Sequence, residues 1–321
     1  MGRFFETLRH FFANMFASSS PGEDYINKLF YFFLILCVVI LAVVLAMVLT
    51  GVIRFRAGKR PGEPEQITGN RVIEIVWTVI PFILVTLFFF FTIRYMRAIN
   101  QPMAASEEDT IRIIAHQWWW EMQYPKLGFY TANELHIPAG QNLLMKIESA
   151  DVIHDWWVPQ LGPKIDAIPG RVNFISIHSR NPGEFRGACS EYCGAQHAHM
   201  LILVVAQEKE EFDRWVKSQQ RVAEIPSDST GKKGYQLFNE KACIKCHNIS
   251  GTGSEEARVG PDLTHLSSRK TILSGMMLTT KENITSWLNN PQKIKEGAHM
   301  PDFMLNTDET TALVTYLEGL K

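Results

Sequence analysis

One short run of the chain concentrates residues that bind soft metal ions. Cys189 and Cys193 are four residues apart, and His197 and Met200 follow them. A mononuclear blue-copper site uses one thiolate, two imidazoles and a weak thioether, so this run holds one thiolate more than such a site needs. Two thiolates can instead bridge two copper ions, each capped by one histidine, with Met200 and a backbone carbonyl as weak outer ligands. The run therefore predicts a binuclear copper site.

The second histidine of such a site must come from another part of the chain. His154 is preferred because apolar packing residues flank it, while His116 and His178 are weaker alternatives. A ligand at His197 closes one loop around the site, so His199 is expected beside the site or exposed to solvent. A disulfide between the two cysteines is the competing interpretation in an oxidising compartment, but it gives no reason for the histidine and methionine that follow.

A second motif is typical of covalent haem attachment. Cys243, Cys246 and His247 form a C-x-x-C-H sequence, in which both thiols form thioethers and the histidine takes the proximal iron position. A thioredoxin-like redox pair is disfavoured because the motif lacks βαβ surroundings and leaves the histidine unexplained. Haem attachment also requires export of this part of the chain.

Four methionines are candidates for the distal iron ligand: Met276, Met277, Met300 and Met304. Met300 is preferred because Pro301 stiffens the neighbouring backbone and the last predicted helix follows shortly afterwards. The other three are expected to serve as packing residues.

Two long uncharged segments predict a membrane hairpin. Residues 29–53 hold no charged side chain, and a helix of that length, at ~1.5 Å per residue, exceeds the ~30 Å hydrocarbon core of a bilayer. Residues 75–93 form a second such run, which Pro81 is expected to kink. Buried helices of a soluble core are disfavoured because they usually carry a polar stripe. Basic residues in the connecting loop place that loop in the cytoplasm and both termini outside.

The patterning divides the chain into four parts. Residues 1–28 carry apolar side chains at helical spacing, which predicts an interfacial amphipathic helix rather than a signal peptide. The membrane hairpin takes residues 29–97. Residues 98–225 show short alternating runs that favour a small antiparallel β-sandwich or barrel, followed by a helix from 208 to about 224. After a linker at 225–231, residues 226–321 give only short helical patterns, which predicts an all-α domain.

With these residues in hand, the chain resembles cytochrome c oxidase subunit II of the caa type, in which a cytochrome c domain is fused behind a copper domain. The likeness runs from about Leu29 to the end of the chain. It implies a cupredoxin-like copper domain whose binuclear centre is called CuA. The ligands that this resemblance implies are His154, Cys189, Glu191 through its carbonyl, Cys193, His197 and Met200.

The same resemblance implies roles for further residues. Trp118 would accept the incoming electron, and the neighbouring tryptophans have core packing as their alternative role. The side chain of Glu191 would bind magnesium, and the loop at 161–171 would contact the catalytic subunit. Glu74 resembles the acid at the mouth of a proton-uptake channel, with a solvated carboxylate at a helix end as the alternative.

The function that the resemblance implies is electron transfer within a respiratory haem–copper oxidase. Electrons would pass from a donor through haem c and CuA to a catalytic subunit that reduces oxygen to water and pumps protons. The expected partners are subunits I and III, the lipid bilayer, and an upstream cytochrome or quinol-oxidising membrane complex. No nucleic acid is expected as a partner. Both redox domains would face the periplasm from a bacterial plasma (inner) membrane.

Two other functions stay open at the level of residues. A CuA-containing nitric oxide or nitrous oxide reductase could use the same copper motif for a different acceptor, although Glu74 and residues 164–171 favour the oxidase. A membrane-tethered copper carrier or redox sensor should exchange its metal readily, whereas two bridging thiolates and a haem favour a fixed electron path.

Overall fold

The computed structural model describes residues 18–56, 66, 69–99, 110–253 and 257–321. It divides into two compact units, one formed by residues 21–101 and the other by residues 1–20 together with residues 102–321. Most of the predicted interfacial segment, residues 1–17, lies outside the described residues.

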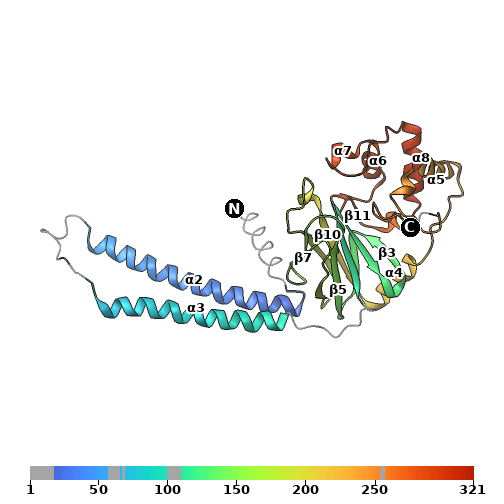
Figure 1. Cartoon of the computed structure of the whole chain (residues 1–321). Coiled ribbons are helices and arrows are strands. Elements are labelled where there is room, and N and C mark those ends of the chain that lie inside the picture. Colours follow the sequence, from blue (N-terminus) through green and yellow to red (C-terminus); the bar gives the residue numbers. More distant parts are fainter. Residues whose placement is uncertain (1–17, 57–65, 67–68, 100–109, 254–256) are drawn as a thin grey trace, which may run out of the picture. The chain divides into compact units, whose positions relative to one another are not determined.

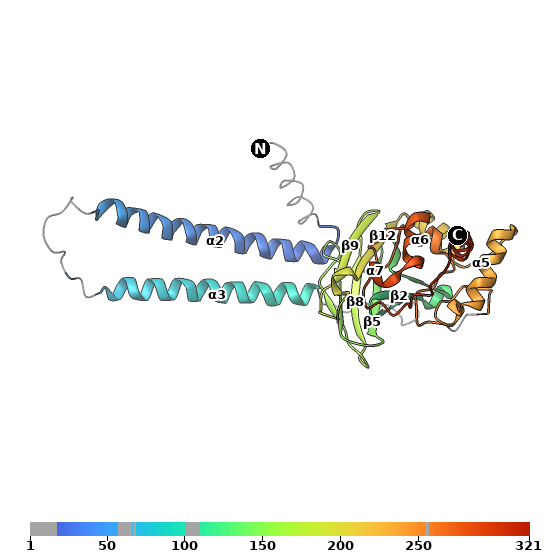
Figure 2. The ribbon, with the colours of Figure 1, turned by 90° about the horizontal axis from the view of Figure 1, so that it is seen from above.

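Two long helices form the first unit. Helix α2 (Pro21–Arg54) and helix α3 (Arg71–Ile99) run side by side (Figure 2), with the rings of Phe32 and Phe88 stacked 6.2 Å apart. Both are long and apolar enough to cross a membrane, and nearly all their large apolar side chains are exposed. The predicted hairpin is confirmed. Helix α2 begins at Pro21, ahead of the predicted span, because proline suits the first helical position, where no backbone N–H donor is needed.

A β-sandwich forms most of the second unit (Figure 1). Within the described residues, one sheet has the order β3 (Phe129–Ala132), β2 (Trp119–Tyr124), β1 (Ile111–His116), β5 (Asn142–Ser149) and β8 (Asn173–His178). The other has the order β4 (Glu134–Pro138), β10 (Leu201–Gln207), β9 (Gly183–Cys189), β6 (His154–Trp157) and β7 (Ile165–Ala167).

The sandwich is confirmed, but the sheets are not wholly antiparallel. Strand β1 runs parallel to β5, and β10 runs parallel to β4. Alternating hydrophobicity predicts which residues of a strand face the core, but it carries no information about the direction of the neighbouring strand. The predicted antiparallel arrangement was therefore wrong for these two pairs.

The core of the sandwich is filled from both sheets by alternating side chains. Trp120 and Met122 of β2 point inward and are fully buried, and Trp120 meets Trp156 of the other sheet edge to face at 5.2 Å. Unexpectedly, the outward-facing Trp119 and Glu121 are also buried, at 8% and 2% exposure. An outer sheet face is normally solvated, so this face of β2 must be covered by another part of the chain.

The covering part is the C-terminal domain, which contains helices α5 (Ser229–Glu240), α6 (Lys281–Asn289), α7 (Pro291–Ile294) and α8 (Thr307–Glu318). These helices are grouped together beside the strands in Figure 1. Helix α4 (Lys209–Gln219) precedes them and ends earlier than predicted. Helix α5 starts at Ser229, where Asp228 caps it by accepting a hydrogen bond from the Gly231 N–H, so the predicted linker is shortened.

A two-stranded hairpin interrupts this helical domain. Strands β11 (Thr271–Ile272) and β12 (Met277–Leu278) pair antiparallel, so the prediction of a domain without strands was wrong in this detail. Strands of two residues are too short to show a period in the sequence. Their turn includes Leu273 and Ser274, both with positive φ. This hairpin presents backbone and hydroxyl groups to the sandwich.

Candidate functional site

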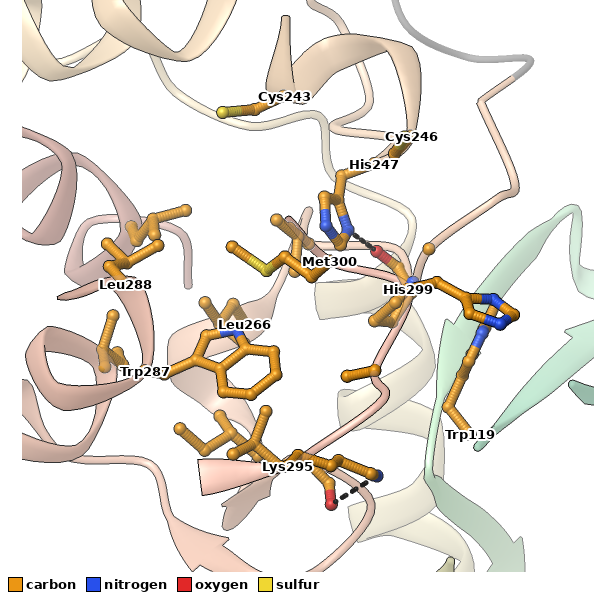
Figure 3. A pocket seen from close by; sticks show the side chains of 18 of the residues that line it. Trp119, Cys243, Cys246, His247, Leu266, Trp287, Leu288, Lys295, His299 and Met300 are labelled. Atoms are coloured by element: carbon orange, nitrogen blue, oxygen red, sulfur yellow. Dashed lines mark hydrogen bonds between the residues drawn. The ribbon is translucent and has the colours of Figure 1, made fainter. Parts of the chain in front are cut away.

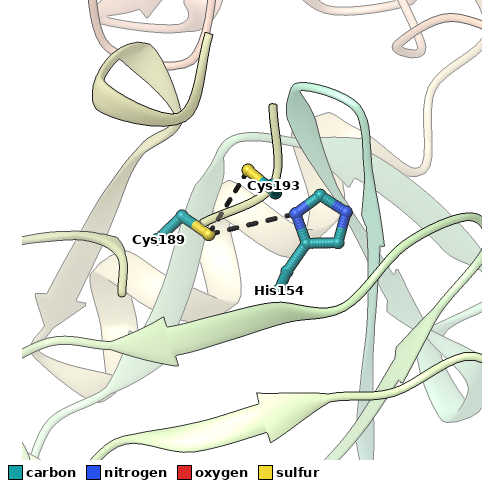
Figure 4. A group of neighbouring side chains, drawn as sticks. All are labelled: His154, Cys189 and Cys193. Atoms are coloured by element: carbon teal, nitrogen blue, oxygen red, sulfur yellow. Dashed lines mark hydrogen bonds between the residues drawn. The ribbon is translucent and has the colours of Figure 1, made fainter. Parts of the chain in front are cut away.

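The two cysteines of the predicted copper run lie side by side in the structure. Cys189 ends β9, Cys193 follows in the next loop, and their Sγ atoms are 3.7 Å apart (Figure 4). Both thiols are free and buried. Strand β6 pairs with β9, which brings His154 to the pair, with its Nδ1 3.9 Å from the Cys189 Sγ. The ligand atoms of these three residues all lie within 4.8 Å of one another.

The other predicted copper ligands surround the same pair of sulfurs. His197 begins the short 3-10 helix η3 (His197–His199), which turns its Nδ1 to 3.6 Å from the Cys193 Sγ. The Met200 sulfur is 3.9 Å from the Cys193 Sγ, and the Glu191 carbonyl is 3.2 Å from the Cys189 Sγ. Each thiol thus has one imidazole and one weaker donor beside it. This symmetric donor set fits two bridged copper ions.

Asp151, which the sequence reasoning missed, orients one of the histidines. Its Oδ1 lies 2.8 Å from Nε2 of His154, so Nδ1 is the ring atom directed at the thiols. Burial opposes the charged imidazolium, but the hydrogen bond to Asp151 raises the pKa of His154. The neighbouring Cys193 thiol, with its Sγ 3.7 Å away, lowers the pKa of Cys189 despite burial. An oriented imidazole beside a thiolate is what a soft metal requires.

The alternative histidines are engaged elsewhere. His116 lies 3.1 Å from Glu121 and stacks on Trp119 at 4.2 Å. His178 is on β8, at the edge of the sheet that does not contain β6 and β9. His199 is exposed, and its Nδ1 is 2.7 Å from the side-chain oxygen of Gln196.

A cavity of about 240 Å³ opens beside the C-x-x-C-H motif. Cys243, Cys246 and His247 line one wall, and apolar side chains of the C-terminal domain, such as Trp287 and Leu288, line another (Figure 3). The motif begins with the 3-10 helix η4 (Cys243–Lys245), which places both thiols on the cavity wall. A large, mainly apolar cavity next to two thiols suits a porphyrin.

The hydrogen bonding and burial of His247 suit it to bind iron. Its Nδ1 donates a 2.8 Å hydrogen bond to the Pro261 carbonyl, so Nε2 is left as the free ring nitrogen. Burial lowers the pKa of His247, which keeps the imidazole neutral. Gly260 is required beside the ring, because a Cβ there would lie 2.6 Å from the imidazole.

Of the four methionines, Met300 lies in the cavity. Its side chain projects into the cavity that His247 also lines (Figure 3), whereas Met276, Met277 and Met304 are not among the cavity residues. Met304 is 87% exposed. The position of Met300 supports its choice as distal ligand.

A buried arginine provides an independent test of the fit to haem. Arg269 lines the cavity, and its Nε and Nη2 have no hydrogen-bond partner among the described residues. The nearest carboxylate is Asp262, at 3.7 Å from Nη2. Unsatisfied buried N–H groups are costly, so these donors call for an anion, and the propionates of a haem are suitable anions. The sequence reasoning missed Arg269 because a single arginine reads as a surface charge.

The C-terminal domain is held against the sandwich by buried polar contacts. The Glu134 carboxylate accepts hydrogen bonds from the backbone N–H groups of Lys270, at 3.1 Å, and Thr271, at 2.8 Å. The Ser274 hydroxyl donates to the Trp118 carbonyl at 2.8 Å, and Arg258 lies 3.8 Å from the buried Glu121. These contacts fix the cavity next to the loop from Cys189 to Met200, which holds the predicted copper ligands and is called the copper loop below.

Trp118 belongs to both sites. Its ring lines the cavity, and its Nε1 donates a 2.9 Å hydrogen bond to the Cys193 carbonyl. The two predicted acidic site residues are exposed to solvent. Glu74 lies in the first turn of α3, and Glu191 lies in the copper loop.

Three regions of the chain match known families. Residues 9–94 match the transmembrane domain of cytochrome c oxidase subunit II, residues 128–207 match its periplasmic domain, and residues 231–321 match cytochrome c. The cytochrome c oxidase subunit 2 of Alkalihalophilus pseudofirmus is 33% identical over 97% of this chain and 95% of that protein. That of Bacillus subtilis is 34% identical over 84% of this chain and 81% of that protein.

Among solved structures, the periplasmic domain of subunit II of cytochrome oxidase from Bradyrhizobium japonicum is similar to part of the chain. It is 34% identical, with a TM-score of 0.35, and the match covers 37% of this chain and 97% of that structure. The sequence similarities together run through the hairpin, the sandwich and the C-terminal domain.

Proposed function

The chain belongs to the cytochrome c oxidase subunit II family, and on that premise we propose that it carries electrons from an external donor through haem c and CuA to a separate catalytic subunit. It is part of an oxidoreductase complex, and its two matched redox regions imply haem c and copper. The observation that carries the proposed path is the position of Trp118, which borders the haem cavity and is hydrogen-bonded to the copper loop.

The cofactor ligands that we propose follow the geometry. Haem c would be attached through Cys243 and Cys246, with His247 and Met300 as axial ligands. CuA would be held by His154, Cys189, Glu191 through its carbonyl, Cys193, His197 and Met200. When bound, both groups supply reversible one-electron chemistry.

The protein's own contribution is orientation and exclusion of water. Trp118 is 8% exposed and Cys193 is 3% exposed, so the space between the two sites is filled by side chains rather than solvent. A buried, rigid surrounding limits rearrangement when the charge of a redox centre changes, and this favours rapid transfer. The indole N–H of Trp118 fixes the ring against the loop that carries the copper ligands.

The assembly that we propose is a bacterial inner-membrane oxidase, with both redox domains on the periplasmic side. Subunit I, supported by subunit III, would reduce oxygen to water with proton pumping. Residues 161–171 would contact subunit I, the side chain of Glu191 would serve a magnesium site there, and Glu74 would stand at the proton-uptake channel. Family membership favours this oxidase over a nitrogen-oxide reductase or a copper carrier.

The electron donor is proposed to be a membrane complex held alongside. Residues 226–321 contain 11 basic and 11 acidic side chains, so 11 - 11 = 0 and the haem domain has no net charge to steer a partner from a distance. The linker and the buried contacts of Glu134 keep the haem domain on the sandwich, which makes the haem-to-copper step intramolecular.

The test is kinetic and uses the intact oxidase in detergent. After photochemical injection of one electron into haem c, the rate of copper reduction should change little from low to high salt, because screening acts weakly on a fixed buried pair. Reduction of haem c by an added soluble cytochrome serves as the control that salt does screen a diffusive encounter. A fall of more than about tenfold in the haem-to-copper rate would contradict the intramolecular path.

A further inference from the structure

A single lysine connects the haem domain to the copper loop. Lys295 follows α7 and is 5% exposed. Its ammonium donates hydrogen bonds to the backbone carbonyls of Trp118 at 2.9 Å, His199 at 3.3 Å and Leu273 at 3.4 Å. These carbonyls belong to the β1–β2 turn, the copper loop and the β11–β12 turn, so one side chain joins the three segments between the two redox sites.

The charge of Lys295 is not neutralised by a carboxylate among the described residues. Burying an ammonium group without a counter-ion is costly, and a neutral donor could satisfy carbonyls at less cost. Burial lowers the pKa of Lys295 to about 8, so the ammonium form still predominates at neutral pH. The His199 carbonyl that it contacts lies between His197 and Met200 in the chain, so the positive charge is held at the loop that carries the predicted copper ligands.

From this geometry we propose that Lys295 is a positioning residue for the haem-to-copper step, which also places a fixed positive charge at the loop that holds the copper thiolates. The inference rests on the proposed function. In that step one electron would leave a haem held at Cys243, Cys246 and His247 and would be taken up by a copper pair held at Cys189 and Cys193. A nearby cation stabilises the copper pair after it has gained the electron, so Lys295 favours transfer in this direction as well as fixing its geometry.

Lys295→Met tests both parts of the proposal, because methionine has a similar length but neither charge nor N–H donors. Lys295→Arg keeps the charge and the donors. Lys293→Met is the matched control. Lys293 lies in α7, two residues before Lys295, and is exposed. Its side chain takes part in no ion pair in the described structure. Haem absorbance and copper content are measured first, in the complete oxidase.

Three readouts separate positioning from packing. The first is the haem-to-copper rate after photochemical electron injection, and the second is the reduction potential of the copper centre. The third is amide hydrogen exchange at Leu201, whose N–H donates to the Ser274 carbonyl across the domain interface at 3.1 Å. This amide is protected only while the domains are docked.

For Lys295→Met we expect at least a tenfold slower rate, a lower copper potential and faster exchange at Leu201. Lys295→Arg should keep the copper potential and recover most of the rate, and Lys293→Met should change none of the three. Faster exchange with unchanged rate and potential would reduce Lys295 to a packing contact and overturn the proposal.

Two further outcomes are informative. If Lys295→Met fails to assemble its cofactors, Lys295→Gln carries the test, because it keeps N–H donors without the charge, and an unchanged copper potential in that variant would overturn the electrostatic role. If the unmodified protein shows no haem-to-copper transfer, the proposed function itself fails. Transfer in the unmodified protein at a rate that Lys295→Met does not alter refutes only the role of Lys295.

Discussion

The indole Nε1 of Trp118 donates a 2.9 Å hydrogen bond to the backbone carbonyl of Cys193. Gly194, the next residue, has a φ of +114°, and a Cβ at that position would lie 3.0 Å from the Trp118 ring. The copper loop can approach the indole this closely because residue 194 is a glycine. The Trp118 ring therefore packs directly against the copper loop and is hydrogen-bonded to it.

Replacing Trp118 should slow electron transfer between the two centres without dismantling them. In Trp118→Ala the ring that fills the space is lost, so the haem-to-copper rate in a flash-reduction experiment should fall at least tenfold. Trp118→Phe keeps an aromatic ring but loses the hydrogen bond to Cys193, so its rate should lie between those of Trp118→Ala and the unmodified protein. Trp119→Phe is the control, because Trp119 also lines the cavity but stacks on His116. Equal rates in all four proteins would return Trp118 to a packing role.

The bridged copper pair should not survive loss of one thiol. In Cys193→Ser a single thiolate remains, which can hold only a mononuclear copper, so the mixed-valence pattern in electron paramagnetic resonance should disappear. Cys37→Ser, in the membrane helix α2, is the control and should leave the spectrum intact. Retention of the mixed-valence signal in Cys193→Ser would exclude this cysteine as a bridging ligand.

Met300→Leu should leave haem covalently attached, because the thioethers depend on Cys243 and Cys246. It should lower the haem reduction potential, since a thioether ligand favours the ferrous state. Met304→Leu is the matched control, since Met304 is 87% exposed and does not line the cavity. Redox titration decides the assignment, and a potential that moves only in the Met304 variant would show that Met300 is not the ligand.

Gly234→Ala should destabilise the haem domain. A Cβ at Gly234 of α5 would lie 2.0 Å from the Ala312 carbonyl oxygen of α8, so the two helices would have to move apart. Overpacking of this kind costs about 1–3 kcal/mol, which should be visible as a lower midpoint when haem absorbance is followed during denaturant unfolding. Gly162→Ala has open space around the new Cβ and should leave that midpoint unchanged. Equal midpoints for both variants would show that α5 and α8 pack less closely than described.

The stability of the sandwich should fall as the solution is acidified from pH 6.5 to pH 4. Burial lowers the pKa of His136 from 6.5 to about 4, so in this window the unfolded chain binds a proton that the folded chain does not. Stability therefore rises with pH across the window and is lost as pH falls. His136→Gln should show a shallower dependence of its thermal midpoint on pH, and an identical slope would assign the effect to other groups.

Local motifs allowed much of this protein to be predicted from its sequence alone. In the C-x-x-C-H run and in the twelve residues from Cys189 to Met200, the candidate ligands are close together in the sequence. Their spacing alone therefore predicts the kind of cofactor site. Helices α2 and α3 follow from uncharged runs long enough to span a bilayer. In each case the residues that act together are close in the sequence.

Tertiary structure decided the partners that are distant in the chain. Strand pairing of β6 with β9 brings His154 to the two cysteines, and Met300 is the candidate methionine that lines the cavity. Asp151, Arg269 and Lys295 escaped sequence reasoning altogether. An isolated charged residue reads as a solvated side chain, because nothing in its neighbours reveals whether another domain will bury it. Only the docking of the haem domain on the outer face of β2 turns Lys295 from a surface charge into a buried link between the two redox sites.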